Sequence, residues 1–389
     1  MDPQLTERIQ RVEASVTLQI TSKAKALQKK GIDIVNFGAG EPDFDTPGQI
    51  KEAAQQAIAD GFTKYTPSSG TVELKQAICD KFKTDNGLEY THENIVVSCG
   101  AKHSLYNVFQ VLCEEGDEVI IPAPYWVSYP QFVKLAGGMP IIIDTNEMNN
   151  FILTPEKLRE HITDKTKIIV LNSPSNPTGA MYTKEQLSQI AQIAVEKNIT
   201  IISDEIYEKI VYDQVHYSIA SLDNSVKELT VVVNGVSKAY SMTGWRIGYL
   251  AAVASIAQAV NKLQSQSTSN PTSISQVAAQ KALTADQSCV TRMVDAFKER
   301  RDYLVSAINS IDGLQVSKPT GAFYAFVNIS SCGISSMDFT SKLLEASRVA
   351  VIPGIAFGSD EYIRLSYATS MNELKKGVER IKEFVSTLK

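Results

Sequence analysis

The chain has 389 residues, a length that predicts two or three domains, or two domains of unequal size. Its 38 basic and 43 acidic residues give a net charge of -5, and this balance argues against a general nucleic-acid-binding protein. The longest nearly apolar stretch, residues 249–260, is too short to cross a bilayer, and the first residues show no signal-peptide pattern.

The five cysteines show no pairing pattern, because their number is odd and their spacing irregular. We therefore expect reduced thiols, a cytoplasmic location and no membrane contact. The chain has only four histidines and lacks the CxxC and HxxxH patterns, so we also expect no metal site.

Short apolar segments alternate with helical patterns in the middle of the chain. The apolar runs predict strands at residues 94–100, 117–124, 167–174, 200–205 and 229–237. Helical spacing of apolar residues predicts helices at 101–113 and 183–198. Such an alternation is typical of a parallel sheet that is covered by helices on both faces.

The two ends of the chain show a different pattern. Residues 286–312 read as one long helix, and short strands mixed with helices follow it, which is typical of an α+β unit. The first 45 residues are expected to join this unit, because their helix precedes the parallel-sheet region. We therefore predict a large domain over 46–285 and a smaller one formed by 1–45 and 286–389.

Polar residues follow three of the predicted strands. Asn176, Asp204 and Lys238 are 28 and 34 residues apart, and each interval is close to one strand–helix–strand unit of about 30 residues. Because ligands gather at the carboxyl ends of parallel strands, all three side chains are expected to face one site.

The residue types at this predicted site fit one cofactor. A lysine after a strand is by itself most often a solvated loop residue, but Lys238 has Asp204 and Arg246 in its company. A buried lysine can form a Schiff base with an aldehyde, an aspartate can keep a pyridine nitrogen protonated, and an arginine can bind a phosphate. Together these residues indicate pyridoxal 5'-phosphate.

Seven motifs carry a resemblance to a known family. They are GEPDFDTP (40–47), KYTPSSG (64–70), PYWVSYP (124–130), NSPSNPTG (172–179), SDEIYE (203–208), SKAYSMTGWRIGY (237–249) and IRLSYA (363–368). In order and spacing, over essentially the whole chain, they resemble the class I pyridoxal-phosphate-dependent aminotransferases, and most of all the bacterial aspartate aminotransferase branch. The resemblance implies the α/β fold type I, in which a mostly parallel seven-stranded sheet lies between helices beside a smaller α+β domain.

The resemblance also implies roles around the cofactor ring. Lys238 would carry the cofactor as a Schiff base and, once freed by substrate, transfer the proton. Asp204 would pair with the ring nitrogen, whereas Tyr207 and Asn176 would donate to the phenolic oxygen. Trp126 would stack on the ring. For Tyr207, Asn176 and Trp126 the alternatives are a core aromatic, a turn residue before proline and a large core residue.

A phosphate site is expected at the start of the helix over 101–113. A glycine at this strand-to-helix junction would leave the backbone N–H groups of Gly100, Ala101 and Lys102 pointing outward, and Arg246 would join them. Many relatives have a serine three residues before the lysine, where this chain has Gly235.

Two further residues of the phosphate site follow from the resemblance. Ser237 is the remaining hydroxyl beside the lysine, although it is not a certain replacement for the missing serine. Tyr65 would reach the phosphate of the partner subunit's cofactor, which implies an obligate homodimer with sites at its interface.

The substrate would be held by its carboxylates. Alternation along 362–368 places Arg364 on the polar face of a strand, where it is either a structural ion pair or, as the resemblance implies, the clamp for the α-carboxylate. Gly40 would lie beside the same carboxylate. Residues 264–273, where many relatives have an arginine, contain no Arg or Lys, so Lys102 and Thr17 are the candidates for a second carboxylate. For Lys102 the alternatives are a partner of the cofactor phosphate and a solvated lysine.

These expectations favour one enzyme over several others. The prediction is a ping-pong aspartate aminotransferase acting on L-aspartate and 2-oxoglutarate. The alternatives are an aromatic or broad-specificity aminotransferase, a carbon–sulfur lyase on the same fold, and a non-catalytic cofactor-binding regulatory domain, which the lack of an added helix-turn-helix segment disfavours. Some prephenate-accepting relatives have a basic residue where this chain has Glu13, which argues against that activity.

Overall fold

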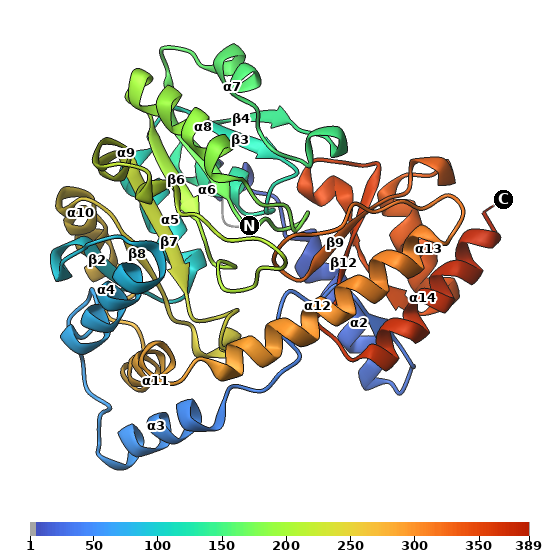
Figure 1. Cartoon of the computed structure of the whole chain (residues 1–389), viewed down its shortest axis with the longest axis horizontal. Coiled ribbons are helices and arrows are strands. Elements are labelled where there is room, and N and C mark those ends of the chain that lie inside the picture. Colours follow the sequence, from blue (N-terminus) through green and yellow to red (C-terminus); the bar gives the residue numbers. More distant parts are fainter. Residues whose placement is uncertain (1–4, 389) are drawn as a thin grey trace.

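The computed structural model describes residues 5–388, and a seven-stranded sheet forms its centre (Figure 1). β8 runs antiparallel to both of its neighbours, whereas all the other pairs are parallel, so the predicted mostly parallel sheet is confirmed. In spatial order the strands are β2 (Ile95–Ser98), β8 (Gly248–Ala251), β7 (Thr230–Gly235), β6 (Thr200–Asp204), β5 (Thr166–Asn172), β3 (Glu118–Ala123) and β4 (Met139–Asp144).

Helices cover both faces of this sheet because alternate strand residues point to opposite sides. Val119 and Ile121 pack on one face, whereas Ile120 between them packs on the other. The first face carries α5 (Ala101–Leu112), α6 (Tyr129–Ala136) and α10 (Ala254–Ser265). The second face carries α7 (Pro155–His161), α8 (Lys184–Lys197), α9 (Asn224–Leu229), α4 (Val72–Asn86) and α11 (Ser273–Thr284), and α3 (Gly48–Ala59) packs on α11.

A smaller antiparallel sheet lies beside the large one (Figure 1). Its strands, in spatial order, are β11 (Ile352–Pro353), β12 (Tyr362–Ser366) and β9 (Tyr324–Asn328). Three helices complete this part: α12 (Ser288–Asn309), which is the long helix expected at 286–312, α13 (Ser336–Ser347) and α14 (Met371–Ser386). No helix in the described part of the chain is long and apolar enough to span a membrane.

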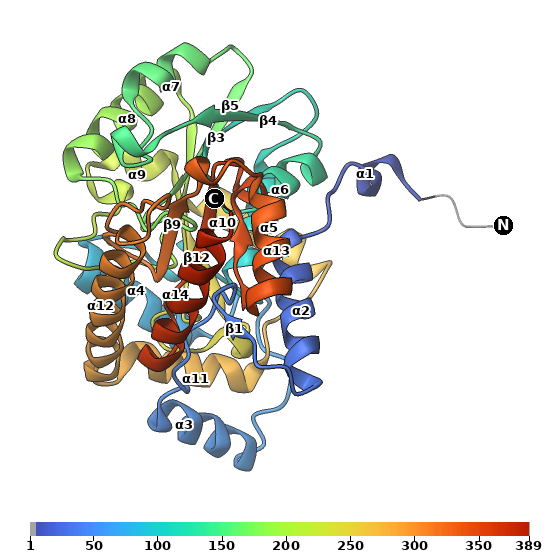
Figure 2. The same cartoon turned by 90° about the vertical axis from the view of Figure 1, so that its right-hand side faces the viewer.

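The N-terminal segment lies partly against the C-terminal part of the chain, whereas its first helix lies apart from that part and contacts α6 (Figure 2). It contains α1 (Glu7–Gln10), α2 (Val16–Lys29) and β1 (Val35–Asn36), and β1 pairs in parallel with β10 (Val349–Ala350). Ala24 of α2 packs with Leu344 and Ala350. The contacts join α2 and β1 to the C-terminal part, and the small domain over 1–45 and 286–389 stays a prediction. Residues 1–4 and 389 lie outside the described residues.

Candidate active site

Polar side chains meet at the carboxyl ends of three neighbouring strands. Asn176 follows β5, Asp204 is the last residue of β6, and Lys238 follows β7. All three line one cavity of about 430 Å³. Their spacing in the sequence thus correctly predicts that they lie together.

Most of the other predicted site residues line the same cavity. They are Thr17, Gly40, Ala101, Lys102, Trp126, Tyr207, Ser237, Arg246 and Arg364. Gly100 adjoins it through Arg246, because a Cβ at Gly100 would collide with that guanidinium. Tyr65 is 92% exposed and does not line its own chain's cavity, so its role in a partner's site stays a prediction.

Lys238 carries the amine of the cavity. Its Nζ donates a hydrogen bond of 2.6 Å to the Gly40 carbonyl oxygen. Burial lowers the pKa of Lys238 to about 8, and the negative charge of Glu41 opposes this effect. A lysine with such a pKa is partly neutral near neutral pH, and the neutral amine is the nucleophilic form.

Asp204 presents a buried carboxylate whose two oxygens both accept hydrogen bonds. The Tyr129 hydroxyl donates to Oδ2 at 2.7 Å, and the Ile206 N–H donates to Oδ1 at 3.2 Å. Burial raises the pKa of Asp204 to about 6, while the Tyr129 hydrogen bond lowers it. The group is therefore largely ionised at neutral pH and can stabilise a protonated ring nitrogen. The sequence analysis missed Tyr129, although it lies in the PYWVSYP motif.

Tyr207 and Tyr324 form a buried pair of phenols. Their hydroxyl oxygens are 2.9 Å apart, and the rings meet edge to face with centroids 5.7 Å apart. Burial raises the pKa of Tyr207 well above its ordinary value, so this side chain is a neutral donor. Tyr324 was not predicted as a site residue. It lies on β9, which pairs with the strand of Arg364 in the small sheet.

Arg364 is a buried cation with neutral hydrogen-bond partners. Its Nη1 donates to Asn176 Oδ1 at 2.9 Å, and its Nη2 donates to the Gly38 carbonyl at 3.0 Å. Its Nε is buried and has no hydrogen-bond partner within the described residues. Both partners being neutral, the positive charge is available for an anionic ligand, as expected of a carboxylate clamp and not of a structural ion pair.

The start of α5 differs from the prediction in one respect. The Gly100 N–H, expected to face a phosphate, donates here to the Ser98 carbonyl oxygen at 2.7 Å, and its role at a phosphate stays a prediction. The turn at Gly100, where φ is +91°, folds this N–H back toward the strand. The first outward N–H groups of the helix are those of Ala101 and Lys102, which have no carbonyl partner inside the helix.

Two glycines explain how β7 and β8 approach this helix start. A Cβ at Gly248 of β8 would collide with the backbone of Ala101. A Cβ at Gly235 of β7 would lie 3.0 Å from the Cα of Gly248, a distance tighter than normal packing allows. A serine in place of Gly235 would therefore require a slightly wider spacing between these two strands of this chain.

Two lysines besides Lys238 line the cavity. Lys102 Nζ lies 4.9 Å from the centroid of the Trp126 ring, and burial lowers its pKa. Thr17 has a buried hydroxyl with no partner within the described residues. The sequence analysis missed Lys25 of α2, which lines the cavity 4.0 Å from Glu41.

The segment before α2 is attached to the large part of the molecule. Glu13 accepts a hydrogen bond from Lys134 Nζ at 2.9 Å, and its N–H donates to Gln131 at 3.0 Å. Both partners belong to α6, so the carboxylate of Glu13 does not line the main cavity.

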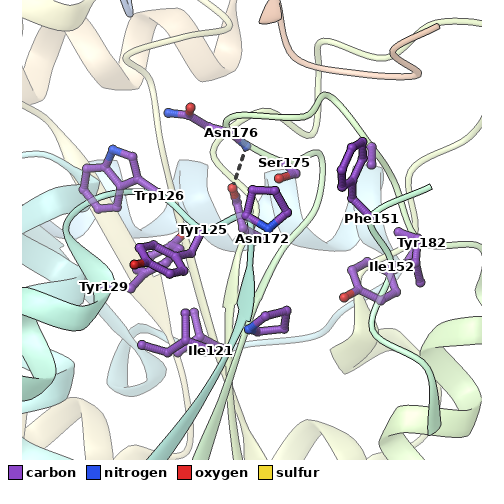
Figure 3. Close-up of a pocket in the computed structure, with 14 residues that line it drawn as sticks. Ile121, Tyr125, Trp126, Tyr129, Phe151, Ile152, Asn172, Ser175, Asn176 and Tyr182 are labelled. Atoms are coloured by element: carbon purple, nitrogen blue, oxygen red, sulfur yellow. Dashed lines mark hydrogen bonds between the residues drawn. The ribbon is translucent and has the colours of Figure 1, made fainter. Parts of the chain in front are cut away.

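A second, smaller cavity (Figure 3) adjoins the main one, since Trp126, Asn172 and Asn176 line both. Its volume of about 30 Å³ is enough for one or two water molecules. The Asn176 N–H donates to Asn172 Oδ1 at 2.8 Å across this region (Figure 3). In this view the side chain of Asn176 points away from the small cavity, which leaves its amide group to the main one.

The fold and the cavity define a class of α/β protein in which a lysine with a depressed pKa, a buried carboxylate and two arginines line one cavity, a set of side chains suited to an anionic ligand with a carbonyl group. The sequence also matches a family model, aminotransferase class I and II, over residues 32–381. The chain therefore belongs to the class I and II aminotransferase family, and it is an aminotransferase.

Individual relatives are similar over nearly the whole chain. An aspartate aminotransferase of Bacillus sp. (strain YM-2) is 52% identical over 98% of this chain and 99% of its own length. An aspartate/prephenate aminotransferase of Nitrosomonas europaea is 47% identical over 98% and 100%. Among solved structures, the aspartate aminotransferase of Thermus thermophilus with maleate has a TM-score of 0.95 and 42% identity, and covers 98% of this chain and 100% of its own.

Proposed function

We propose that the protein is a pyridoxal-phosphate-dependent aspartate aminotransferase. L-Aspartate would give up its amino group and leave as oxaloacetate, and 2-oxoglutarate would then accept the amino group and leave as L-glutamate. The observation that carries the proposal is the meeting of Lys238, Asp204 and Arg364 in one cavity. The curated relatives that are about half identical over the full length support it.

The residues of the cavity fit pyridoxal 5'-phosphate. Lys238 would hold its aldehyde carbon and Asp204 its ring nitrogen, and the buried, hydrogen-bonded state of Asp204 suits a cationic partner. Tyr207 and the amide of Asn176 would donate to its phenolic oxygen, and Trp126 would cover the ring. The phosphate would be held by Ser237, Arg246 and the free N–H groups of Ala101 and Lys102.

The cofactor, when bound, supplies a carbonyl group that takes up the amine and a ring that accepts electrons. The chain's own residues manage protons and charge. Lys238 Nζ would take the proton from the α-carbon of the amino acid and return it, since its pKa near 8 keeps a useful fraction of the amine neutral. Asp204 would keep the proton on the ring nitrogen by staying ionised.

The carboxylates of the substrate would orient it. Arg364 would bind the α-carboxylate, and Gly40, whose Cβ would lie 3.3 Å from the Tyr324 hydroxyl, leaves room there. Lys102 and Thr17 would meet the second carboxylate. The Thermus thermophilus relative with maleate, itself a dicarboxylate, supports a site for two carboxylates.

A broader amino acid specificity is the second candidate function. Leu18 and Val127 also line the cavity, and Lys102 lies over the Trp126 ring, so an apolar side chain finds contacts there too. Several relatives are aspartate/prephenate aminotransferases. Glu13, the residue that speaks against prephenate in the sequence, is bound to Lys134 of α6 and does not line the cavity, so the use of prephenate stays open to the amino acid and oxo acid panel.

We also propose a homodimer. Tyr65 is 92% exposed, and the exposed apolar side chains of Ile58, Phe62 and Val72 flank it in the sequence. Such a surface suits a second copy of the chain, which would receive Tyr65 at its phosphate site. The cytoplasmic location stays a prediction from the cysteine content.

A coupled assay tests the proposed reaction. Oxaloacetate formation from L-aspartate should depend on added 2-oxoglutarate, and kcat/KM should be highest for acidic amino acids within a panel of amino acids. A higher kcat/KM for phenylalanine would favour the broad-specificity candidate. The absence of any amino-group transfer by the cofactor-loaded protein would contradict an enzymatic role.

A further inference from the structure

We propose that Tyr324 is a positioning residue that orients two site residues at once, the Tyr207 hydroxyl and the Arg364 guanidinium. The inference rests on the proposed function, because it assumes that Tyr207 donates to the cofactor's phenolic oxygen. Tyr324 would act through these two residues and would not itself take part in the reaction.

The first link is the pair of phenol groups. Tyr324 is fully buried on β9, and its hydroxyl oxygen is 2.9 Å from that of Tyr207. A hydroxyl group has one hydrogen, so only one of the two can donate in this bond. If Tyr207 gives its hydrogen to an acceptor in the cavity, its oxygen must accept the hydrogen of Tyr324. The contact thus fixes the direction of both donors.

The consequence for Tyr207 is a stronger hydrogen bond to the cavity. A hydroxyl that accepts a hydrogen bond becomes a better donor, because hydrogen bonds in a chain polarise one another. The Tyr324 hydroxyl would therefore help Tyr207 to stabilise an anionic oxygen, even though it lies one residue further from the cofactor.

The second link is between the Tyr324 ring and the cation of Arg364. Arg364 pairs with Phe326 across the small sheet, and Tyr324 pairs with Ser366, so Tyr324 is a diagonal neighbour of Arg364. The guanidinium carbon lies 4.4 Å from the centroid of the Tyr324 ring and 5.1 Å from that of Phe357. The two rings hold the guanidinium in place by cation–π contacts.

The hydroxyl and the ring of Tyr324 therefore have separable effects. Tyr324→Phe removes only the hydroxyl, whereas Tyr324→Leu removes the ring as well. The charged groups that face the pair are Asp204, Arg364, Glu41 and Lys238, whose Nζ is 5.8 Å from the Tyr207 ring centroid. None of them is altered in either variant.

The test is a pH titration of the visible absorbance of the cofactor-loaded protein without substrate. Tyr207→Phe should raise the pH midpoint of the absorbance change by about one unit, because the anionic phenolic oxygen of the cofactor loses a hydrogen bond. Tyr324→Phe should raise this midpoint by about 0.3 unit, roughly a twofold change in the acid dissociation constant of the titrating group. In the double variant the midpoint should equal that of Tyr207→Phe alone, since Tyr324 acts through Tyr207.

Steady-state kinetics test the second link. Tyr324→Leu should raise the KM for aspartate about fivefold through Arg364, whereas Tyr324→Phe should leave it unchanged. Thermal unfolding checks that each variant is folded. If Tyr324→Leu does not fold, the comparison of Tyr207→Phe, Tyr324→Phe and the double variant still tests the first link.

Three results would overturn the inference: an unchanged midpoint in Tyr324→Phe, additive shifts in the double variant, or an equal rise in KM for both Tyr324 variants. A wild-type protein that takes up no pyridoxal 5'-phosphate would instead contradict the proposed function. The two failures are thus distinguishable.

Discussion

Tyr129→Phe removes one hydroxyl group from the buried carboxylate of Asp204. Burial raises the pKa of Asp204 to about 6, and the hydrogen bond of 2.7 Å from Tyr129 opposes this rise. A hydrogen bond to a charged group contributes roughly 1.5–3 kcal/mol, and one pKa unit corresponds to about 1.4 kcal/mol, so the pKa should rise by about 1–2 units. The ionised form of Asp204 would then be lost at a higher pH as the solution is acidified.

The assay is the pH profile of kcat/KM for aspartate, whose acid limb reports the ionisation of essential carboxylates in the free enzyme. A protonated ring nitrogen lowers the pKa of Asp204 both in the wild type and in Tyr129→Phe, so the quantity to compare is the difference between their acid limbs. Tyr125→Phe is the matched control, because Tyr125 lines the same small cavity (Figure 3) but has no hydrogen bond to Asp204. Equal acid limbs in the two variants would refute the reasoning.

Three further predictions concern other residues of the site. Tyr65→Phe and Lys238→Ala subunits, each impaired alone, should regain activity when mixed into hybrid dimers, and mixing would restore nothing if Tyr65 served its own chain. Lys102→Ala should raise the KM for aspartate and 2-oxoglutarate much more than for phenylalanine. Lys25→Ala, which removes another lysine of the cavity, is the control. If it raises the KM for the acidic substrates as much as Lys102→Ala does, the effect is one of general charge. The rate at which cofactor-free protein takes up pyridoxal 5'-phosphate should rise with pH around a midpoint near 8. Glu41→Gln should lower that midpoint, because the variant loses a negative charge that raises the pKa of Lys238. A midpoint near the ordinary lysine value of 10.5 would contradict this prediction.

The parallel part of the large sheet could be predicted because its strands are buried on both faces and read as continuous apolar runs. Two strands were not identified. β4 is an edge strand whose residues are mostly exposed or half-buried, and Pro140 within its apolar run argues against an inner strand. β8 has only four residues and begins with Gly248, whose small size matters only once α5 lies against it.

The site residues fall into those whose position follows from the order of the strands and those whose position depends on contacts between distant parts of the chain. Asn176, Asp204 and Lys238 could be brought together from the sequence because strand ends are ordered by topology. Tyr324 could not be assigned, because its hydroxyl meets Tyr207 across 117 positions of the chain, and neither residue's spacing encodes that contact. The hydrogen bond of the Gly100 N–H to Ser98 depends on a local turn that motif reading does not resolve.

The central claim is that Lys238 is the covalent attachment point of pyridoxal 5'-phosphate, and borohydride reduction followed by peptide mapping tests it most directly. Reduction should fix the cofactor on the peptide that contains Lys238, and Lys238→Ala should yield no labelled peptide and no visible absorbance from the attached cofactor. Stable labelling of a different lysine in the wild-type protein, or labelling that persists in Lys238→Ala, would contradict the assignment of the site.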